Sequence, residues 1–253
     1  MNVAVLLVAA GAGTRLDAGL PKAFAPLCGQ PLLAHALRGV LGCAEVGHVV
    51  VVAPGSHVDQ ARDLAGQARD VAGQARNLAE KARNFADEAR EVAGHDPRVE
   101  VVAGGTDRSA SVVAGLAALS PDDGIVLVHD AARCLAPADL FARVIHAVRS
   151  GHPAVVPGLG LSDTIKVVDA QGRVLDTPAR ESLRGIQTPQ GFSRAVLVGA
   201  HAGGGSATDD AGLVERAGGH VHVIDGDPRA FKITTALDLA VASAMLQDVP
   251  YAG

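Results

Sequence analysis

Short apolar segments alternate with helical segments along most of the chain, and this alternation constrains the fold more than any other feature. Six aliphatic runs predict strands at residues 3–8, 49–53, 99–102, 125–129, 154–156 and 221–224. Because the runs are almost continuously apolar, they are typical of strands covered on both faces. Helical patterns occupy residues 32–41, 109–119, 138–149, 195–202, 209–217 and 236–246. The sequence therefore predicts an α/β fold with a mainly parallel sheet, whose ligands bind beyond the carboxyl ends of the strands.

Two segments interrupt the alternation, and one of them predicts a β-hairpin. Residues 164–169 and 173–177 alternate in polarity and flank the short turn Ala170-Gln171-Gly172. This pattern is typical of a hairpin. Because it stands between core elements, we expect it to project from the domain as an arm. A surface hairpin without a role is the alternative interpretation.

The other interruption is an internal repeat, residues 60–94, which consists of five heptads from QARDLAG to EAREVAG. Each heptad places alanine at positions 2 and 6 and Leu, Val or Phe at position 5, which makes one apolar stripe on a helix. A helix over residues 58–93 would be about 54 Å long. We interpret it as a helical insertion made by tandem duplication. It predicts either an unusually long surface helix or self-association through the stripe.

Composition excludes several classes of protein. The chain has 253 residues, of which 48% are apolar, and a formal net charge of −5. We expect one globular domain over residues 1–253. The acidic balance and the 2% aromatic content argue against a nucleic-acid partner. We expect no membrane partner, because no apolar run is long enough to span a bilayer. We expect no signal peptide, because the apolar start lacks a basic region and runs into a glycine loop. The three cysteines form no paired motif, which suits reduced thiols and a cytoplasmic location.

A glycine loop follows the first predicted strand. It reads Ala9-Ala10-Gly11-Ala12-Gly13-Thr14-Arg15-Leu16. It has neither the G-K-[ST] of a Walker loop nor the third glycine of a dinucleotide fingerprint. Two cations, Arg15 and Lys22, follow the glycines closely. Backbone N–H groups together with fixed positive charge are what a triphosphate or pyrophosphate requires, although a turn with solvated cations is the alternative.

Two further loops are expected at the same edge of the sheet. The first, residues 104–111, offers glycines, hydroxyls and a cation at the start of a helix, which suits a nucleoside or a phosphate. The second begins at Asp130, directly after a predicted strand. A carboxylate in this place is a natural Mg²⁺ ligand, since Mg²⁺ is usually held by one or two carboxylates and by substrate phosphates. We interpret the neighbouring His129 as structural.

Seven motifs in order give the chain a specific resemblance. They are AAGAGTRL with PKAF, AGGTDRSASV, LVHDAAR, LSDTIK, QTPQGF, ATDDAGLVE and DPRAFKIT. Together they resemble the 2-C-methyl-D-erythritol 4-phosphate cytidylyltransferases of non-mevalonate isoprenoid biosynthesis, from Val3 to about Leu246, interrupted by the heptads. The resemblance implies a Rossmann-like nucleotidyltransferase fold, with a projecting arm over residues 158–188 that builds a homodimer.

The resemblance also implies roles for individual residues. CTP phosphates would be held by Ala10, Gly11, Ala12 and Gly13, and cytosine and ribose by Gly105, Thr106 and Ser111. Catalytic charge would come from Arg15, Lys22 and Lys232, and Mg²⁺ would be held by Asp130. The methylerythritol phosphate would be bound by Ala131, Arg133, Thr164, Arg180, Thr188 and Thr208, of which Thr164 and Arg180 would reach the partner's site. The family often has aspartate where Thr106 stands, and other residues where Cys134 stands.

The implied reaction is attack by the substrate's phosphate oxygen on the α-phosphorus of CTP, with pyrophosphate as the leaving group. A phosphate monoester is already anionic, so positioning and charge stabilisation suffice without a strong base. A sister enzyme acting on another polyol phosphate, such as ribitol 5-phosphate, is the nearest alternative. A non-catalytic helical assembly protein is the alternative from another class, and the presence of all the expected charged residues argues against it.

Overall fold

A single mixed sheet organises the protein in our computed structural model, which describes residues 1–11, 20–84, 98–203 and 207–247. Its strand order is β10-β7-β11-β6-β1-β4-β5, with β12 paired to β7. The strands are β1 (Asn2–Val8), β4 (His48–Ala53), β5 (Arg98–Ala103), β6 (Asp123–Asp130), β7 (Ala154–Gly160), β10 (Arg184–Ile186), β11 (Gln190–Ser193) and β12 (His222–Asp225). The pairs β6-β1-β4-β5 and β7-β12 are parallel, whereas β10 and β11 are antiparallel to their neighbours.

The predicted elements correspond closely to the observed ones. The helices are α1 (Leu32–Leu41), α2 (Val58–Asn84), α3 (Arg108–Ala117), α4 (Ala138–Arg149), α5 (Arg194–Ala202), α6 (Asp210–Arg216) and α7 (Ala236–Leu246). The α/β fold with a mostly parallel sheet is confirmed. The two antiparallel strands β10 and β11 were not predicted, because their short sequences RGI and QGFS carry no apolar run. A small hairpin of β2 (Pro26–Leu27) and β3 (Gln30–Pro31) was also missed.

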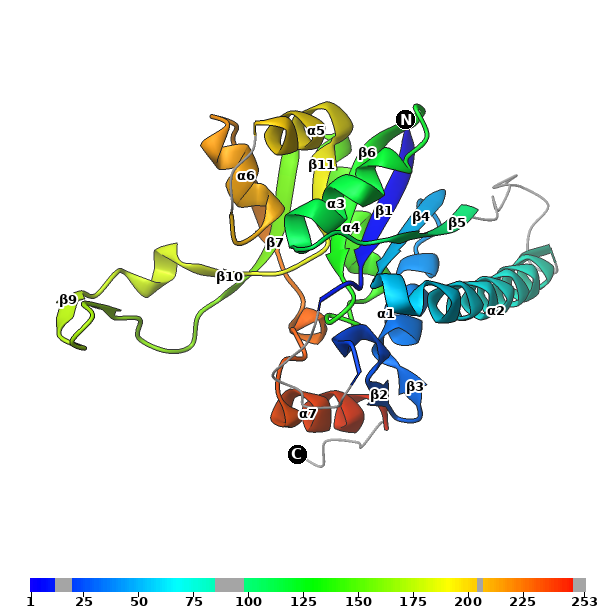
Figure 1. Cartoon of the computed structure of the whole chain (residues 1–253), viewed down its shortest axis with the longest axis horizontal. Coiled ribbons are helices and arrows are strands. Elements are labelled where there is room, and N and C mark those ends of the chain that lie inside the picture. Colours follow the sequence, from blue (N-terminus) through cyan, green and yellow to red (C-terminus); the bar gives the residue numbers. More distant parts are fainter. Residues whose placement is uncertain (12–19, 85–97, 204–206, 248–253) are drawn as a thin grey trace.

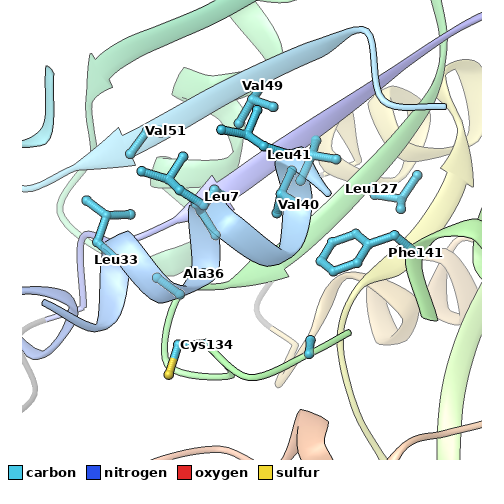
Figure 2. Close-up of a cluster of buried hydrophobic side chains, with 14 of the residues drawn as sticks. Leu7, Leu33, Ala36, Val40, Leu41, Val49, Val51, Leu127, Cys134 and Phe141 are labelled. Atoms are coloured by element: carbon cyan, nitrogen blue, oxygen red, sulfur yellow. The ribbon is translucent and has the colours of Figure 1, made fainter. Parts of the chain in front are cut away.

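Two hydrophobic clusters show that helices cover both faces of the sheet (Figure 1). One cluster joins alternate residues of β1, such as Leu7, to α1 and to Phe141 of α4, as Figure 2 shows. The other joins the intervening residues, such as Leu6, to α3, α5 and α6. This alternation is the two-residue period of a strand that is buried on both sides. The strand and helix order therefore builds a doubly wound, three-layer domain.

Helix α2 packs on the domain through its first two heptads. Ala61 and Ala65 are buried in the core, and Leu64, Ala68 and Ala72 pack against it at their helical spacing. The rest of the helix, as far as Asn84, extends away from the sheet in Figure 1. The predicted continuation to residue 93 lies outside the described residues. That the heptads are an insertion stays a prediction.

The predicted hairpin is formed by β8 (Val167–Val168) and β9 (Val174–Asp176), and its paired segments are shorter than predicted. It stands away from the layered domain in Figure 1. Its apolar side chains are 44–60% exposed, at Val167, Val168, Val174 and Leu175. A two-stranded hairpin that buries so little apolar surface is marginally stable by itself.

Candidate functional site

A cleft of about 390 Å³ opens at the carboxyl ends of β1, β5 and β6. Nine of the predicted site residues line it, which are Ala10, Gly11, Lys22, Gly105, Thr106, Ser111, Asp130, Ala131 and Lys232. They come from five separate parts of the sequence. The parallel order β6-β1-β4-β5 brings the loops after these strands to one edge, as expected for a ligand site in a doubly wound sheet.

The first two loops lie so close together that one position requires glycine. A Cβ atom on Gly104 would lie 2.6 Å from the Cβ atom of Ala10 and 2.9 Å from the Oγ atom of Ser111. Backbone hydrogen bonds tie both loops to the end of β4, since Ala9 donates to Val52 at 2.8 Å and Gly104 donates to Ala53 at 2.7 Å. The missing side chain therefore lets the glycine loop and the second loop form one wall of the cleft.

Helix α3 begins at this wall. Asp107 caps it, because its side chain accepts a hydrogen bond from the backbone N–H of Ala110 at 2.8 Å. The hydroxyl of Ser111 donates to the carbonyl of Asp107 at 2.7 Å and accepts from the N–H of Gly105 at 3.2 Å. Ser111 is buried, so its hydroxyl holds the loop in shape. The helix N-terminus adds a partial positive charge to the cleft.

Asp130 is the carboxylate of the cleft, and two cations flank it. Lys232 Nζ donates to its Oδ2 atom at 2.7 Å, and Arg108 Nε lies 3.4 Å from its Oδ1 atom. Burial alone would raise the pKa of Asp130, but the charges of Arg108 and Lys232 outweigh it and lower the pKa to about 2. Asp130 is therefore ionised at neutral pH.

Thr188 and His129 lie behind Asp130. The Thr188 hydroxyl accepts the backbone N–H of Asp130 at 3.0 Å and lies 2.9 Å from His129 Nδ1. Burial lowers the pKa of His129 to about 4, so the ring is neutral at pH 7. Burial and the contact with Thr188 are compatible with a structural role for His129, which stays a prediction. In this arrangement the Thr188 hydroxyl fixes the end of β6.

Arg133 supports the segment that carries Lys232. Its guanidinium donates to the carbonyl of Ala230 at 2.8 Å and to that of Ile186 at 3.1 Å. The backbone N–H of Ile233 in turn donates to the carbonyl of Ala132 at 2.9 Å. These bonds hold the residues on both sides of Lys232 against the end of β6.

The remaining predicted residues lie elsewhere or cannot be placed. Thr164 and Arg180 belong to the arm, and Arg180 donates to the carbonyl of Ser162 at 2.7 Å and lines a second cavity of about 560 Å³. Thr208 is exposed just before α6. None of these three lines the cleft. Ala12, Gly13 and Arg15 lie outside the described residues.

Sequence reasoning missed two charged residues of this region as site residues. Arg108 lines the cleft. Asp210 lies behind Arg108, and the distance from Arg108 Nη2 to Asp210 Oδ2 is 2.7 Å. Arg108 stands in the loop that the sequence singled out, so its charge was visible. Asp210 gives no such signal, because only the packing of α6 against α5 and β7 brings it here.

The carboxylate is compatible with a divalent cation. Asp130 is ionised and lines the cleft of about 390 Å³. Within the described residues, no group of three or more His, Cys, Asp or Glu side chains is arranged to hold a metal by itself. One carboxylate suits Mg²⁺, which leaves its other positions to water and substrate phosphates. Among the same residues, no helix is long and apolar enough to cross a membrane.

The fold and the cleft define a Rossmann-like α/β protein. At the carboxyl edge of the sheet its cleft combines part of a glycine loop, a helix N-terminus, cations and one carboxylate, a set of groups that suits a polyanion. The model of one family, IspD, 2-C-methyl-D-erythritol 4-phosphate cytidylyltransferase, matches residues 3–248. The chain belongs to this family.

Individual relatives agree with this assignment. The chain is 48% identical over 247 residues to a bifunctional IspD/IspF enzyme of Clavibacter michiganensis, covering 97% of this chain and 54% of that protein. It is 46% identical to the 2-C-methyl-D-erythritol 4-phosphate cytidylyltransferase of Saccharopolyspora erythraea, covering 97% of this chain and 100% of that one. A crystal structure of 4-diphosphocytidyl-2C-methyl-D-erythritol synthase from Anaerococcus prevotii has a TM-score of 0.76 at 26% identity, over 97% and 98% of the chains.

Proposed function

We propose that this protein transfers CMP from CTP to 2-C-methyl-D-erythritol 4-phosphate and releases pyrophosphate, forming 4-diphosphocytidyl-2-C-methyl-D-erythritol for isoprenoid biosynthesis. The observation that carries the proposal is the cleft, where Lys232 and Arg108 flank Asp130 and Lys22 lines the same space beside the glycine loop. The cations suit the charge that develops when pyrophosphate leaves. No strong general base is required, because the attacking phosphate is already anionic.

The residues divide the work of the reaction. Ala10 and Gly11 offer backbone contacts to the triphosphate, and Gly105 and Thr106 stand in the neighbouring loop, where the nucleoside would lie. Lys22 and Lys232 stabilise the transferring and leaving phosphates, together with Arg15. Asp130 would hold Mg²⁺, which offsets phosphate charge when bound. We also infer a cytoplasmic location, which the three free cysteines support.

Pyrophosphate release tests the activity. Purified protein is incubated with CTP and Mg²⁺ and with either methylerythritol phosphate or ribitol 5-phosphate. We expect kcat/KM to be at least about 100-fold higher for methylerythritol phosphate. Comparable turnover of both compounds would favour a broader polyol-phosphate cytidylyltransferase. No turnover of either would refute the activity.

We further propose that the arm builds a homodimer and that Thr164 and Arg180 serve the partner's site. The exposed valines and leucine of the hairpin support this, because a second copy would cover them. Arg180 also lies outside its own subunit's cleft. Residues 158–188 would then be a dimerisation arm.

Mixed dimers test the arm. Arg180→Ala and Lys22→Ala proteins are each expected to be nearly inactive. After subunit exchange, hybrid dimers contain one site in which both residues are intact, so part of the activity returns. Mass spectrometry of tagged subunits verifies the exchange. If verified hybrids stay inactive, Arg180 acts within its own chain or has no role.

A further inference from the structure

Arg108 connects the carboxylate of the cleft to a second, deeper carboxylate. Its Nε atom lies 3.4 Å from Asp130 Oδ1, and its Nη2 atom lies 2.7 Å from Asp210 Oδ2. The two aspartates are 80 positions apart in the sequence, at the end of β6 and at the start of α6. One planar guanidinium thus bridges two separate elements of the fold. Its fixed fork can hold two carboxylates at defined places, which the single charged group of lysine cannot do.

The inner end of this bridge is enclosed by protein. Asp210 has no exposed surface, and its Oδ1 atom lies 3.0 Å from His201 Nε2 of α5. Burial alone would raise the pKa of Asp210, but the hydrogen bond with His201 and the charge of Arg108 outweigh it and hold the pKa below its usual value. Asp210 is therefore a buried negative charge that keeps Arg108 in one place.

The backbone that carries Asp210 is tied to the sheet. Gln190 of β11 donates from Nε2 to Asp209 Oδ2 at 2.7 Å, and its Oε1 atom accepts the backbone N–H of Ala211 at 3.2 Å. Gln190 is itself buried. The residues on either side of Asp210 are thus fixed to the strand next to β6. The position of Arg108 is set by the framework of the protein.

The other cation at Asp130 is held differently. Lys232 pairs with Asp130 Oδ2 from a loop, and its side chain is 41% exposed, compared with 30% for Arg108 and none for Asp210. A long exposed lysine exchanges partners at low cost, whereas a guanidinium that is paired to a buried carboxylate does not. The two oxygens of Asp130 therefore face one fixed cation and one exchangeable cation.

We propose that Arg108 is a positioning residue for the phosphoryl transfer and that buried Asp210 holds it against Asp130. The pair keeps the Asp130 carboxylate in its working orientation when Lys232 moves to the transferring phosphate. This inference rests on the proposed function. Neither Arg108 nor Asp210 is assigned a direct contact with the reacting atoms.

A purely structural role is the alternative. Asp210 stands in the first turn of α6, where a negative charge stabilises a helix, and it also pairs with His201. Stability alone does not require a buried ion pair, because well-packed apolar residues often replace such pairs without loss. The two roles differ in one respect that can be measured. A positioning role passes through Arg108, and a structural role does not.

A double-mutant cycle separates the two roles. The variants are Asp210→Asn, Arg108→Met and the double variant, with Asp123→Asn as a matched control. Asp123 is also a buried aspartate paired with a histidine, at the opposite end of β6. We expect Asp210→Asn to lower kcat by about 10-fold, a typical loss for a second layer of contacts, and to leave the calorimetric Kd for CTP within about 3-fold. The double variant should be no slower than Arg108→Met. Asp123→Asn should keep its kcat.

Other results would overturn the proposal. Folded Asp210→Asn with wild-type kcat, multiplicative losses in the double variant, or an equal loss in Asp123→Asn would each indicate a structural role. If Asp210→Asn does not fold, the comparison of Arg108→Lys with Arg108→Met decides. If Arg108→Lys is as slow as Arg108→Met at unchanged CTP affinity, the result supports positioning by the guanidinium fork, and wild-type kcat in Arg108→Lys refutes it. A wild-type protein without turnover overturns the proposed function and this inference together, whereas an active wild type with unaffected variants overturns only the inference.

Discussion

Strand β6 carries a buried aspartate at each end, and the fold gives the two aspartates different partners. At the amino end, Asp123 Oδ2 lies 2.7 Å from His48 Nδ1 and accepts the backbone N–H of Ser120 at 2.8 Å. At the carboxyl end, Asp130 faces the cleft between Arg108 and Lys232. Both aspartates are buried residues, at most 9% exposed. Burial by itself therefore does not distinguish a structural aspartate from a functional one.

The difference lies in where the partners come from. The partners of Asp123 belong to β4, two strands away in the sheet, and to the turn that leads into β6, so they are part of the framework. The cations at Asp130 come from the start of α3 and from the loop before α7, and one of them is largely accessible. In a parallel sheet the helix N-termini and the loops after the strands gather at the carboxyl edge. Aspartate is thus enclosed by protein at the amino edge of the sheet and accessible to a ligand at the carboxyl edge.

Removing the charge of the aspartate at each end of β6, in separate variants, gives the largest expected difference in kcat. Asp130→Asn should lower kcat by about 10²–10³-fold, the scale of losing one preorganised electrostatic contact, whereas Asp123→Asn should stay within about 3-fold. Steady-state pyrophosphate release measures both, with circular dichroism to verify the folds. The comparison of the two ends would fail if Asp123→Asn lost as much activity as Asp130→Asn while still folded.

At the amino end of β6, loss of the buried carboxylate should reduce the stability of the fold and leave activity largely unchanged. Asp123→Ala leaves the ring of His48 and the N–H of Ser120 without their partner inside the protein, which should cost about 3 kcal/mol of unfolding free energy. Urea denaturation measures the loss. The exposed neighbour Asp122 provides the control, because Asp122→Ala should cost less than about 0.5 kcal/mol. Equal losses would mean that the buried pair contributes no net stability.

The histidine next to Asp130 sharpens the comparison through pH. The pKa of His129 is lowered to about 4 in the folded protein, compared with 6.5 for an ordinary histidine. The unfolded chain therefore binds a proton as the pH falls below about 6.5, while the folded protein does not until about pH 4, so acid favours unfolding across this window. Between pH 7 and pH 5 the wild type should lose about 2 kcal/mol more than His129→Asn. Urea titrations of both proteins at the two pH values test this, and equal losses would contradict it.

The fold was largely predictable, because apolar runs and helical spacing report directly on burial. The six predicted strands and all seven predicted helices have counterparts, whereas β10 and β11 were missed because their neighbours in space determine them. A strand such as QGFS becomes part of a sheet only when β6 and β7 lie on both sides of it.

The cleft was predictable to a similar degree. The glycine loop, Lys22 and Asp130 could be predicted as site residues from their residue types and from their places after predicted strands. Ser111 also lines the cleft, but in this structure its hydroxyl donates to the carbonyl of Asp107 and so holds the loop, a role that residue type alone does not indicate. Asp210 could not be predicted, since its importance depends on a contact with Arg108 that local sequence does not contain.

The smallest expected effect concerns α2, which starts near the cleft and runs away from it. His57, just before the helix, contacts the ring of Phe24, two positions from Lys22, with ring centroids 4.7 Å apart. Because β4 and β5 are parallel, the helix that connects them leads from the carboxyl edge towards the amino edge. Turns added at its far end therefore lengthen it away from the cleft.

Deleting residues 74–87, two whole heptads, tests this reading. The deletion keeps the buried Ala61 and Ala65 and the packed Leu64 and Ala72, and shifts the phase of the stripe by only about 40°. We expect turnover and CTP affinity within about 3-fold of the wild type, and a smaller hydrodynamic radius by analytical ultracentrifugation. As a control on the docked part, Ala65→Asp should destabilise the fold by several kcal/mol, because it buries an unpaired charge, while Val71→Asp, at a position that is 58% exposed, should not. A folded deletion variant without turnover would show that the distal heptads act on the cleft, so that the long helix belongs to the functional edge of the molecule.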